Sequence, residues 1–167
     1  MDSPLTELGL AQAARVGALF AGRIDDPADW RLISSPLGRA EHTARIIGAA
    51  TGLEPALDER LIELSIGSWE GLARHQIEAL RPDLAGQPFF MHAPDGELWE
   101  VASARIASFL ADHAGPANVI AVSHAGAGKV LRGVHMALTL TQARHLDTPQ
   151  DGVYALSPGT TQRFDCP

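Results

Sequence analysis

The sequence is short of cysteine and of long apolar runs. Cys166 is the only cysteine among 167 residues, so the chain can form neither an internal disulfide nor a cysteine-based metal site. A reducing compartment such as the cytoplasm is the default location for a chain of this kind. No apolar run reaches about 18 residues and the first residues are polar, so we expect neither a membrane span nor a signal peptide.

Positive charge is scarce as well. Lysine and arginine number 13 against 20 aspartate and glutamate residues, which gives a formal net charge of -7. This balance disfavours non-specific binding to nucleic acid or to an anionic membrane, because both attract basic surfaces. A small anionic ligand remains compatible with it, since a local pocket can be positive. The length and the 46% hydrophobic content fit one globular domain over residues 1–167.

Helix-like and strand-like segments alternate along the chain. Apolar residues recur at helical spacing in residues 3–22, 37–52, 69–82, 97–115 and 125–138. Strands are predicted at 31–35 and 117–124, an extended segment at 53–67, and a terminal hairpin at 152–157 and 160–165. This alternation predicts a three-layer α/β/α sandwich with a mostly parallel sheet.

Some local details of this prediction are specific. The apolar run "ANVIAVSH" is typical of a central strand that is buried on both faces. The buried stripe of the helix over 37–52 is expected to contain Ala40, Ala44 and Ile47. In the helix over 97–115, the corresponding stripe is expected to contain Val101, Ala104, Ala107 or Ser108, and Leu110 or Ala111.

Two strand–turn–helix segments, "ISSPLGRA" and "VIAVSHAGAG", are candidates for a binding site. In α/β folds, ligands bind beyond the carboxyl ends of the strands, where such turns lie. Arg39 falls in the first turn of a helix and can hold phosphate oxygens there, although an exposed helix arginine fits the pattern too. His124 ends the second strand, where it either binds an anion and passes a proton or serves as a hydrogen-bonded structural residue.

Three carboxylates are further candidates. Glu63 lies within the apolar segment "RLIELSIG", where partial burial would suit a general acid and exposure would make it an ordinary strand residue. Glu70 and Glu97 are second choices, because each is more simply a residue at a helix start that the helix dipole favours.

Other ionisable residues carry weaker predictions. Lys129 and Arg132 follow the His124 turn and either assist an anionic substrate or lie on an exposed helix face. The remaining histidines lack the paired spacing of a metal site and are expected to be surface or core residues: His42, His75, His92, His113, His135 and His145. The loop "AGQPFFMHAPDGE" is expected to shape the entrance to the site, with Phe89 or Phe90 bounding the pocket.

Taken together, several segments resemble the histidine phosphatase superfamily, in its phosphoglycerate-mutase-like branch. In chain order the matching motifs are "DSPLTELGLAQA", "SSPLGRAEHTA", "RLIELSIGSWEG", "PDGE", "VSHAG" and the C-terminal "VLRGVHMAL" and "TPQDGVYALSPG". They follow the family's order and cover nearly the whole chain, which is more specific than any one motif. The resemblance implies a phosphoglycerate-mutase-like fold.

The resemblance also implies a chemistry, in which a phosphoryl group passes to a histidine nucleophile and then to water or a second substrate. Arg39 would bind phosphate, His124 would bind phosphate and stabilise the transferring group, and Glu63 would donate a proton to the leaving oxygen. No metal or organic cofactor is implied. The expected partner is a small phosphorylated substrate or inorganic phosphate, without nucleic acid or membrane, and a homodimer is one option for the oligomeric state.

One motif of that family has no counterpart in the 167 residues. The family's Arg-His-Gly sequence, which supplies the nucleophilic histidine on the first strand, does not occur. We therefore expect an N-terminally incomplete domain whose first strand is missing. Three hypotheses follow: a phosphomonoester phosphatase whose N-terminal part lies outside this sequence, with a mutase as runner-up; an inactive module that binds phosphate or phosphoesters through Arg39 and His124; or a poorly stable remnant without function.

Overall fold

At the centre of the protein is a sheet of three parallel strands. The computed structural model describes residues 3–87, 89, 91–150 and 152–166. In spatial order the strands are β2 (Pro55–Leu57), β1 (Trp30–Ser34) and β3 (Asn118–Val122). Ser34 pairs with Leu57 on one side and with Val122 on the other. The three strands therefore end level with one another, at one edge of the sheet.

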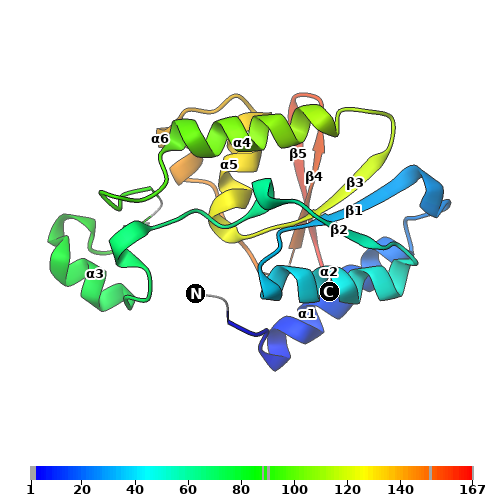
Figure 1. Cartoon of the computed structure of the whole chain (residues 1–167), viewed down its shortest axis with the longest axis horizontal. Coiled ribbons are helices and arrows are strands. Elements are labelled where there is room, and N and C mark those ends of the chain that lie inside the picture. Colours follow the sequence, from blue (N-terminus) through cyan, green and yellow to red (C-terminus); the bar gives the residue numbers. More distant parts are fainter. Residues whose placement is uncertain (1–2, 88, 90, 151, 167) are drawn as a thin grey trace.

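Helices cover both faces of this sheet and complete the predicted α/β/α sandwich (Figure 1). One face is covered by α1 (Glu7–Ala21) and α2 (Gly38–Thr51). The other is covered by α4 (Trp99–Asp112) and α5 (Ala125–His135). Within the described ranges, no helix is long and apolar enough to cross a membrane.

The remaining elements are short. Two further helices are α3 (Arg74–Leu80) and α6 (Leu140–Arg144). Single 3-10 turns are η1 (Pro27–Asp29), η2 (Glu59–Leu61), η3 (Gly67–Trp69) and η4 (Pro82–Leu84). The predicted terminal hairpin is present as the antiparallel pair β4 (Gly152–Ser157) and β5 (Thr160–Asp165).

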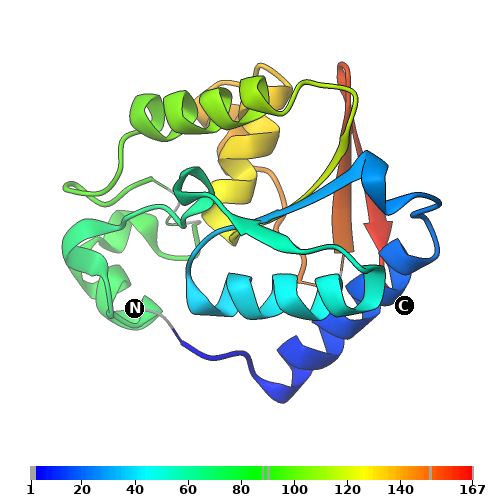
Figure 2. The same ribbon diagram turned by 45° about the vertical axis from the view of Figure 1, so that its right-hand side comes forward.

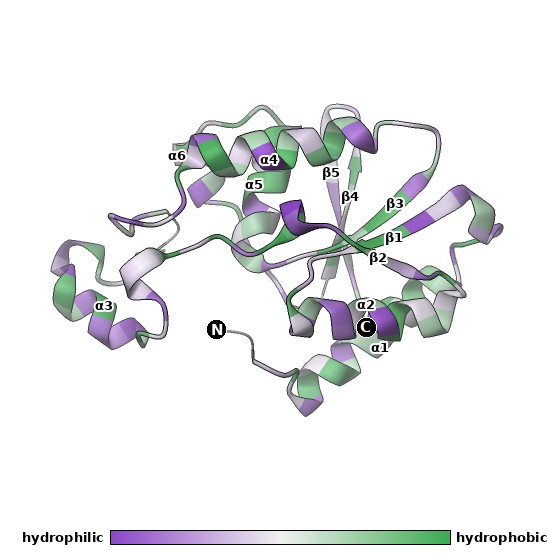
Figure 3. Ribbon diagram, in the orientation of Figure 1, coloured by the Kyte–Doolittle hydropathy of each residue, from purple (hydrophilic) through white to green (hydrophobic). Residues whose placement is uncertain are grey.

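The core between α2 and the sheet follows the sequence prediction. Ala40, Ala44 and Ile47 are buried and pack against Ile120 and Val122 of β3. Figure 3 shows the same distribution, with most of β3 and part of β1 hydrophobic between the two helical layers. Burial of these aliphatic side chains is the main favourable contribution to folding here, at about 25 cal/mol for each Å² removed from water.

The buried face of α4 differs from the prediction. Val101 and Ala104 are exposed and Leu110 is half-buried against the core, whereas Ala102, Ile106 and Phe109 are buried against the sheet. The physical reason is that alanines occur on every side of this helix, so the apolar pattern alone does not define one face. The larger residues, isoleucine and phenylalanine, decide the orientation because they remove the most apolar surface from water.

The position of β3 also differs from the prediction of a central strand. Among the described strands β1 is central and β3 lies at the edge of the sheet. Ile120 and Val122 are buried on the α2 side, Val119 is half-buried on the α4 side, and Ala121 is exposed. The strand is therefore fully buried on its α2 face only, and the apolar run does not specify how many strands lie beside it.

The hairpin is held by side chains, because β4 pairs only with β5 among the described strands. Arg132 of α5 stacks on the ring of Tyr154 at 3.9 Å, and the ring of His135 donates from Nε2 to the carbonyl of Ser157 at 2.8 Å. Away from the turn, Arg23 lies over the ring of Phe164, which pairs with Val153, at 5.1 Å. The hairpin thus runs from the α5 layer to the α1 layer (Figure 2).

Residues 65–97 form a smaller unit beside the sheet, around α3 (Figure 1). Trp69, Ile77 and Leu84 are buried in a cluster of their own, and Phe89 packs against it with its ring 6.1 Å from that of Trp69. Phe89 is therefore part of this small core, which leaves its predicted place at a pocket entrance unsupported. Phe90, the alternative, lies outside the described residues.

A partly buried group of ion pairs around Arg60 joins η2 to α4. Arg60 binds both carboxylate oxygens of Asp58, at 2.7–3.1 Å, and also reaches Asp112 at 2.7 Å. The hydrogen bonds from Arg60 lower the pKa of Asp58 below its ordinary value. A carboxylate with a lowered folded-state pKa stabilises the fold above its unfolded pKa of about 4, and this stabilisation is lost as the pH falls through the folded value.

We expect the Arg60→Met variant to lose about 1 kcal/mol of unfolding free energy at pH 7, because these hydrogen bonds are removed. The deficit should shrink as the pH falls below about 4, where Asp58 becomes protonated in the unfolded and then in the folded state. Urea unfolding at pH 7 and pH 3.5 measures both. The matched control is Arg81→Met, whose similar pair with Asp83 is more exposed and should matter less. Equal deficits at the two pH values would contradict the assignment.

Candidate functional site

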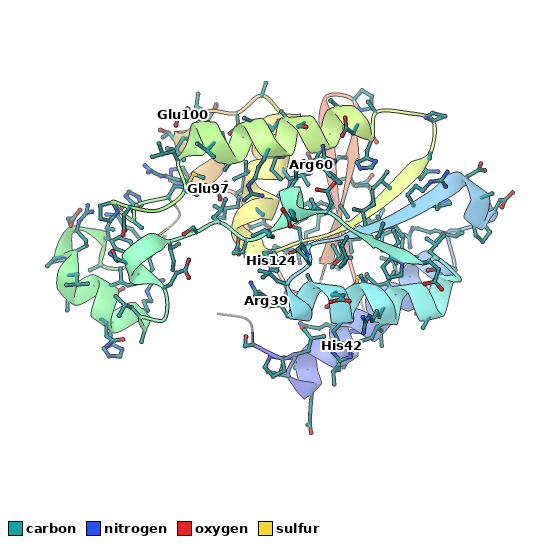
Figure 4. All side chains as sticks on the ribbon, viewed as in Figure 1. Arg39, His42, Arg60, Glu97, Glu100 and His124 are labelled. Carbon is teal, nitrogen blue, oxygen red and sulfur yellow. The ribbon has the colours of Figure 1, made fainter. Side chains whose placement is uncertain are left out.

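The level ends of β1 and β3 bring two candidate residues to one edge of the sheet. Because Ser34 lies opposite Val122, the turns that follow the two strands are neighbours. Arg39 lies in the first turn of α2, and His124 is the N-cap residue of α5. Figure 4 shows their side chains together beyond the carboxyl ends of the strands, as the sequence predicts.

Backbone and hydroxyl hydrogen bonds attach a third segment to the same edge. Asp58 N–H donates to the carbonyl of Ser34 at 2.9 Å, and Ser123 Oγ donates to the carbonyl of Leu61 at 2.8 Å. These bonds fix η2 beside the end of β3. Glu63 follows η2 by two residues, so the third candidate reaches the start of α5.

The carboxylate of Glu63 is bound to the N-terminus of α5. Its Oε1 accepts the N–H groups of Leu64 and Ala127, each at 2.9 Å, and its Oε2 accepts the N–H of Gly126 at 3.1 Å. Helix N-termini carry unpaired N–H donors and a partial positive charge, which together favour a carboxylate. Glu63 is half-buried, so its burial is partial, as the general-acid prediction requires, and it is not an exposed strand residue.

The imidazole of His124 is half-buried and has a defined orientation. Its Nε2 lies 2.8 Å from the hydroxyl of Ser35, the residue that follows β1. Its carbonyl accepts the N–H of Gly128, which closes the first turn of α5. Arg39 is half-buried as well, and its carbonyl accepts the hydroxyl of Thr43. A guanidinium, an imidazole and a carboxyl group thus surround one edge, a set that can bind an anion and move a proton.

The second-choice carboxylates lie elsewhere. Glu70 is exposed and follows η3 instead of starting a helix, and its Oε1 accepts the hydroxyl of Ser65 at 3.1 Å. Glu97 precedes α4 but its two oxygens bind Arg105, at 2.7 and 2.9 Å, in a largely buried ion pair. Figure 4 shows Glu97 apart from the Arg39–His124 pair.

Lys129 and Arg132 do not lie on an exposed helix face. They are only 9% and 6% exposed. Lys129 Nζ donates to the carbonyl of Arg144 at 3.0 Å, and burial lowers its pKa below the ordinary lysine value. Arg132 binds Asp147 at 3.0 Å and stacks on Tyr154. Both residues therefore connect α5 to the C-terminal part of the chain.

The other histidines are dispersed over the molecule. His42, His75 and His145 are exposed, and Figure 4 shows His42 on α2, away from His124. His92 is half-buried, and burial lowers its pKa. Over the described ranges, no group of three or more His, Cys, Asp or Glu residues is placed to hold a metal ion.

Sequence reasoning missed two residues of this edge, Ser35 and Gly126. Ser35 bonds the His124 ring, and Gly126 lies against the carboxylate of Glu63. A signal existed for Ser35, because a small polar residue directly after a buried strand has no apolar role. No comparable signal existed for Gly126, since three other small residues surround it in "AGAG".

Comparisons with known proteins agree with the fold. The sequence profile of the histidine phosphatase superfamily (branch 1) matches residues 1–163. A protein named "Probable phosphoglycerate mutase", from Yersinia pestis (strain Pestoides F), is 43% identical over 82 residues. Those residues are 49% of this chain and 35% of that protein, so the match spans well under half of such curated relatives.

Solved structures extend the similarity over more of the chain. A mycobacterial glucosyl-3-phosphoglycerate phosphatase in complex with inorganic phosphate has a TM-score of 0.75 and 30% identity, covering 88% of this chain and 76% of its own. The product of an open reading frame of Mycobacterium tuberculosis has a TM-score of 0.79 and 26% identity, covering 99% and 85%. These neighbours share the mostly parallel α/β fold with helices around the sheet.

The position of the Glu63 carboxylate at the N-terminus of α5 depends on the absence of a side chain at position 126. A Cβ there would lie 2.6 Å from Glu63 Oε1 and 3.0 Å from Leu64 Cδ1, whereas a Cβ at Gly128 would meet nothing within 4 Å. We expect Gly126→Ala to displace the carboxylate and to lower the unfolding free energy by about 1–2 kcal/mol. Gly128→Ala should instead stabilise the helix by up to about 1 kcal/mol. Urea unfolding measures the unfolding free energy of both variants, and equal values would contradict the described position of the Glu63 carboxylate.

Proposed function

The chain belongs to the histidine phosphatase superfamily (branch 1), and on that premise we propose that it is a phosphomonoester phosphatase acting through a phosphohistidine. One observation carries the proposal: Arg39 and His124 lie together beyond the carboxyl ends of the parallel strands, and Glu63, from a third segment, binds the N-terminus of the helix that His124 caps. Phosphoryl transfer requires mainly positioning and electrostatic stabilisation of the transferring group, which such a set can supply.

Each residue has a distinct role in this proposal. Arg39 binds two phosphate oxygens through its planar guanidinium, at a helix start where N–H groups favour anions. His124 binds a further oxygen and stabilises charge on the transferring group. Glu63 gives a proton to the leaving oxygen. The Glu63 carboxylate accepts three backbone N–H bonds, and only one of them goes to Oε2. Oε2 therefore retains a lone pair that can hold the proton.

The nucleophilic histidine of the proposed reaction is not provided by an Arg-His-Gly sequence within these 167 residues. The proposal assigns it to a segment outside them. The alternative is a catalytically inactive module that holds phosphate or phosphoesters through Arg39 and His124. The observation that favours this alternative is the same missing motif, because the described residues retain the phosphate-binding candidates without it.

The name of the Yersinia relative supports a second alternative, a phosphoglycerate-mutase-type phosphotransferase. The two reactions differ in the acceptor, water or a second substrate, and they share the proposed residues. The proposal includes one domain over residues 1–167, a small phosphorylated substrate or inorganic phosphate as partner, and no cofactor. The single cysteine supports a cytoplasmic location.

Binding of inorganic phosphate tests the site on the chain itself. We expect Arg39→Ala to weaken binding at least about tenfold, because charge-assisted hydrogen bonds contribute about 1.5–3 kcal/mol. The matched control is Arg45→Ala on the same helix, whose side chain is 69% exposed and pairs with Glu41. Isothermal titration calorimetry measures the affinities. The absence of binding by the unaltered chain, or equal losses in the two variants, would contradict the proposed site.

Hydrolysis of p-nitrophenyl phosphate separates the enzyme from the binding module. We expect near-background rates from the 167-residue chain, because loss of a nucleophile removes most of the rate. The same chain preceded by the residues encoded directly upstream should hydrolyse the ester and carry acid-labile phosphate on histidine. Full activity of the 167-residue chain, or an in-frame stop codon before any Arg-His-Gly sequence, would exclude the proposed arrangement. Addition of phosphoglycerate as acceptor distinguishes the mutase.

A further inference from the structure

Ser35 has an unusually constrained position between the two halves of the site. It follows the last residue of β1, and its exposed fraction is 0%. Its N–H donates to the carbonyl of Val122 at 2.9 Å, which extends the pairing between the two strands by one residue. The backbone of Ser35 is therefore fixed relative to the end of β3, which is two residues before His124.

Among the described residues, the hydroxyl of Ser35 has two hydrogen-bond partners. It lies 2.8 Å from Nε2 of His124 and accepts the N–H of Leu37 at 3.3 Å. A hydroxyl carries one donor and two acceptor positions. Since Leu37 uses one acceptor position, one donor and one acceptor position remain for the imidazole.

This arrangement can hold the ring in both of its protonation states. When Nε2 carries no proton, the serine O–H donates to it; when Nε2 is protonated, the serine oxygen accepts from it. A carboxylate in the same place would only accept, and would therefore favour the imidazolium. A methyl group would do neither.

We propose that Ser35 is the positioning residue of His124, which keeps the imidazole in one place while its charge changes. The inference rests on the proposed function for the meaning of that place, because a ring that binds phosphate and stabilises a transferring group must not move as charge develops. The contact itself is independent of the function. Ser35 acts through His124 and is not assigned a contact with substrate.

The chain offers a matched control in the adjacent residue. Ser34 is also 0% exposed, and its hydroxyl donates to the carbonyl of Ser35 at 2.9 Å without reaching the ring. Ser34→Ala and Ser35→Ala therefore delete the same atom at the same depth, one beside the imidazole and one not. Ser35→Thr restores the hydroxyl and tests rescue.

The experiment combines ring spectroscopy with phosphate binding on the full chain. Long-range ¹H–¹⁵N NMR spectra report the tautomer and environment of the His124 ring, with the His124→Gln variant used to assign its signals. Calorimetry measures the affinity of each variant for inorganic phosphate. Thermal unfolding confirms that each variant is folded. If the added methyl of Ser35→Thr prevents folding, the two alanine variants still decide the question.

We expect Ser35→Ala to shift the His124 Nε2 signal and to weaken phosphate binding about tenfold, with Ser34→Ala changing neither and Ser35→Thr resembling the unaltered chain. An unchanged ring signal in Ser35→Ala, or the same shift in Ser34→Ala, would overturn the positioning role. If the unaltered chain binds no phosphate while the ring signal still depends on Ser35, the positioning role stands and the proposed function fails. If phosphate binds and the ring signal does not depend on Ser35, the positioning role fails and the proposed function stands.

Discussion

The parallel pairing of β1 with β3 is the constraint on which the candidate site depends. Because Ser34 lies opposite Val122, the helices that follow the two strands begin side by side, and the residues at their starts face the same space. The pairing continues through Ser35, and the hydroxyl of that residue then meets the ring that follows the other strand. The geometry of the side chains is thus a consequence of hydrogen bonds between backbone groups that take no part in the proposed reaction.

The local electrostatics of this edge oppose the charge of the whole chain. The protein has a formal net charge of -7, but Arg39, His124 and the donor groups of two helix starts gather here. Glu63 is the internal anion that meets these donors, and its carboxylate occupies two N–H groups of α5. The N-terminus of α5 is therefore already bound by a carboxylate of the protein itself, and the proposed anion site depends on Arg39 and His124 instead.

Much of the fold could be predicted from the sequence, because the signals were local. Helix α2 has a strict apolar stripe, so Ala40, Ala44 and Ile47 were identified, and the hairpin was marked by a Pro-Gly turn. Local signals failed where the buried face of a helix or the position of a strand depended on which other elements pack against it. The alanines of α4 left its buried face undecided, and the apolar run of β3 did not specify an edge position. Lys129 and Arg132 are buried where they bind Arg144 and Asp147, each 15 residues further along the chain.

The candidate site shows the same division. Arg39, His124 and Glu63 were found because each has an unusual place in its own segment, but their meeting depends on contacts that bridge up to 89 residues, such as that between Ser35 and His124. The edge position of β3 has a separate consequence. An apolar strand with one strand partner among the described residues keeps outer backbone N–H and C=O groups to which a further strand can add. The outer edge of Asn118–Val122 is therefore the place at which a strand from outside the described residues would extend the sheet.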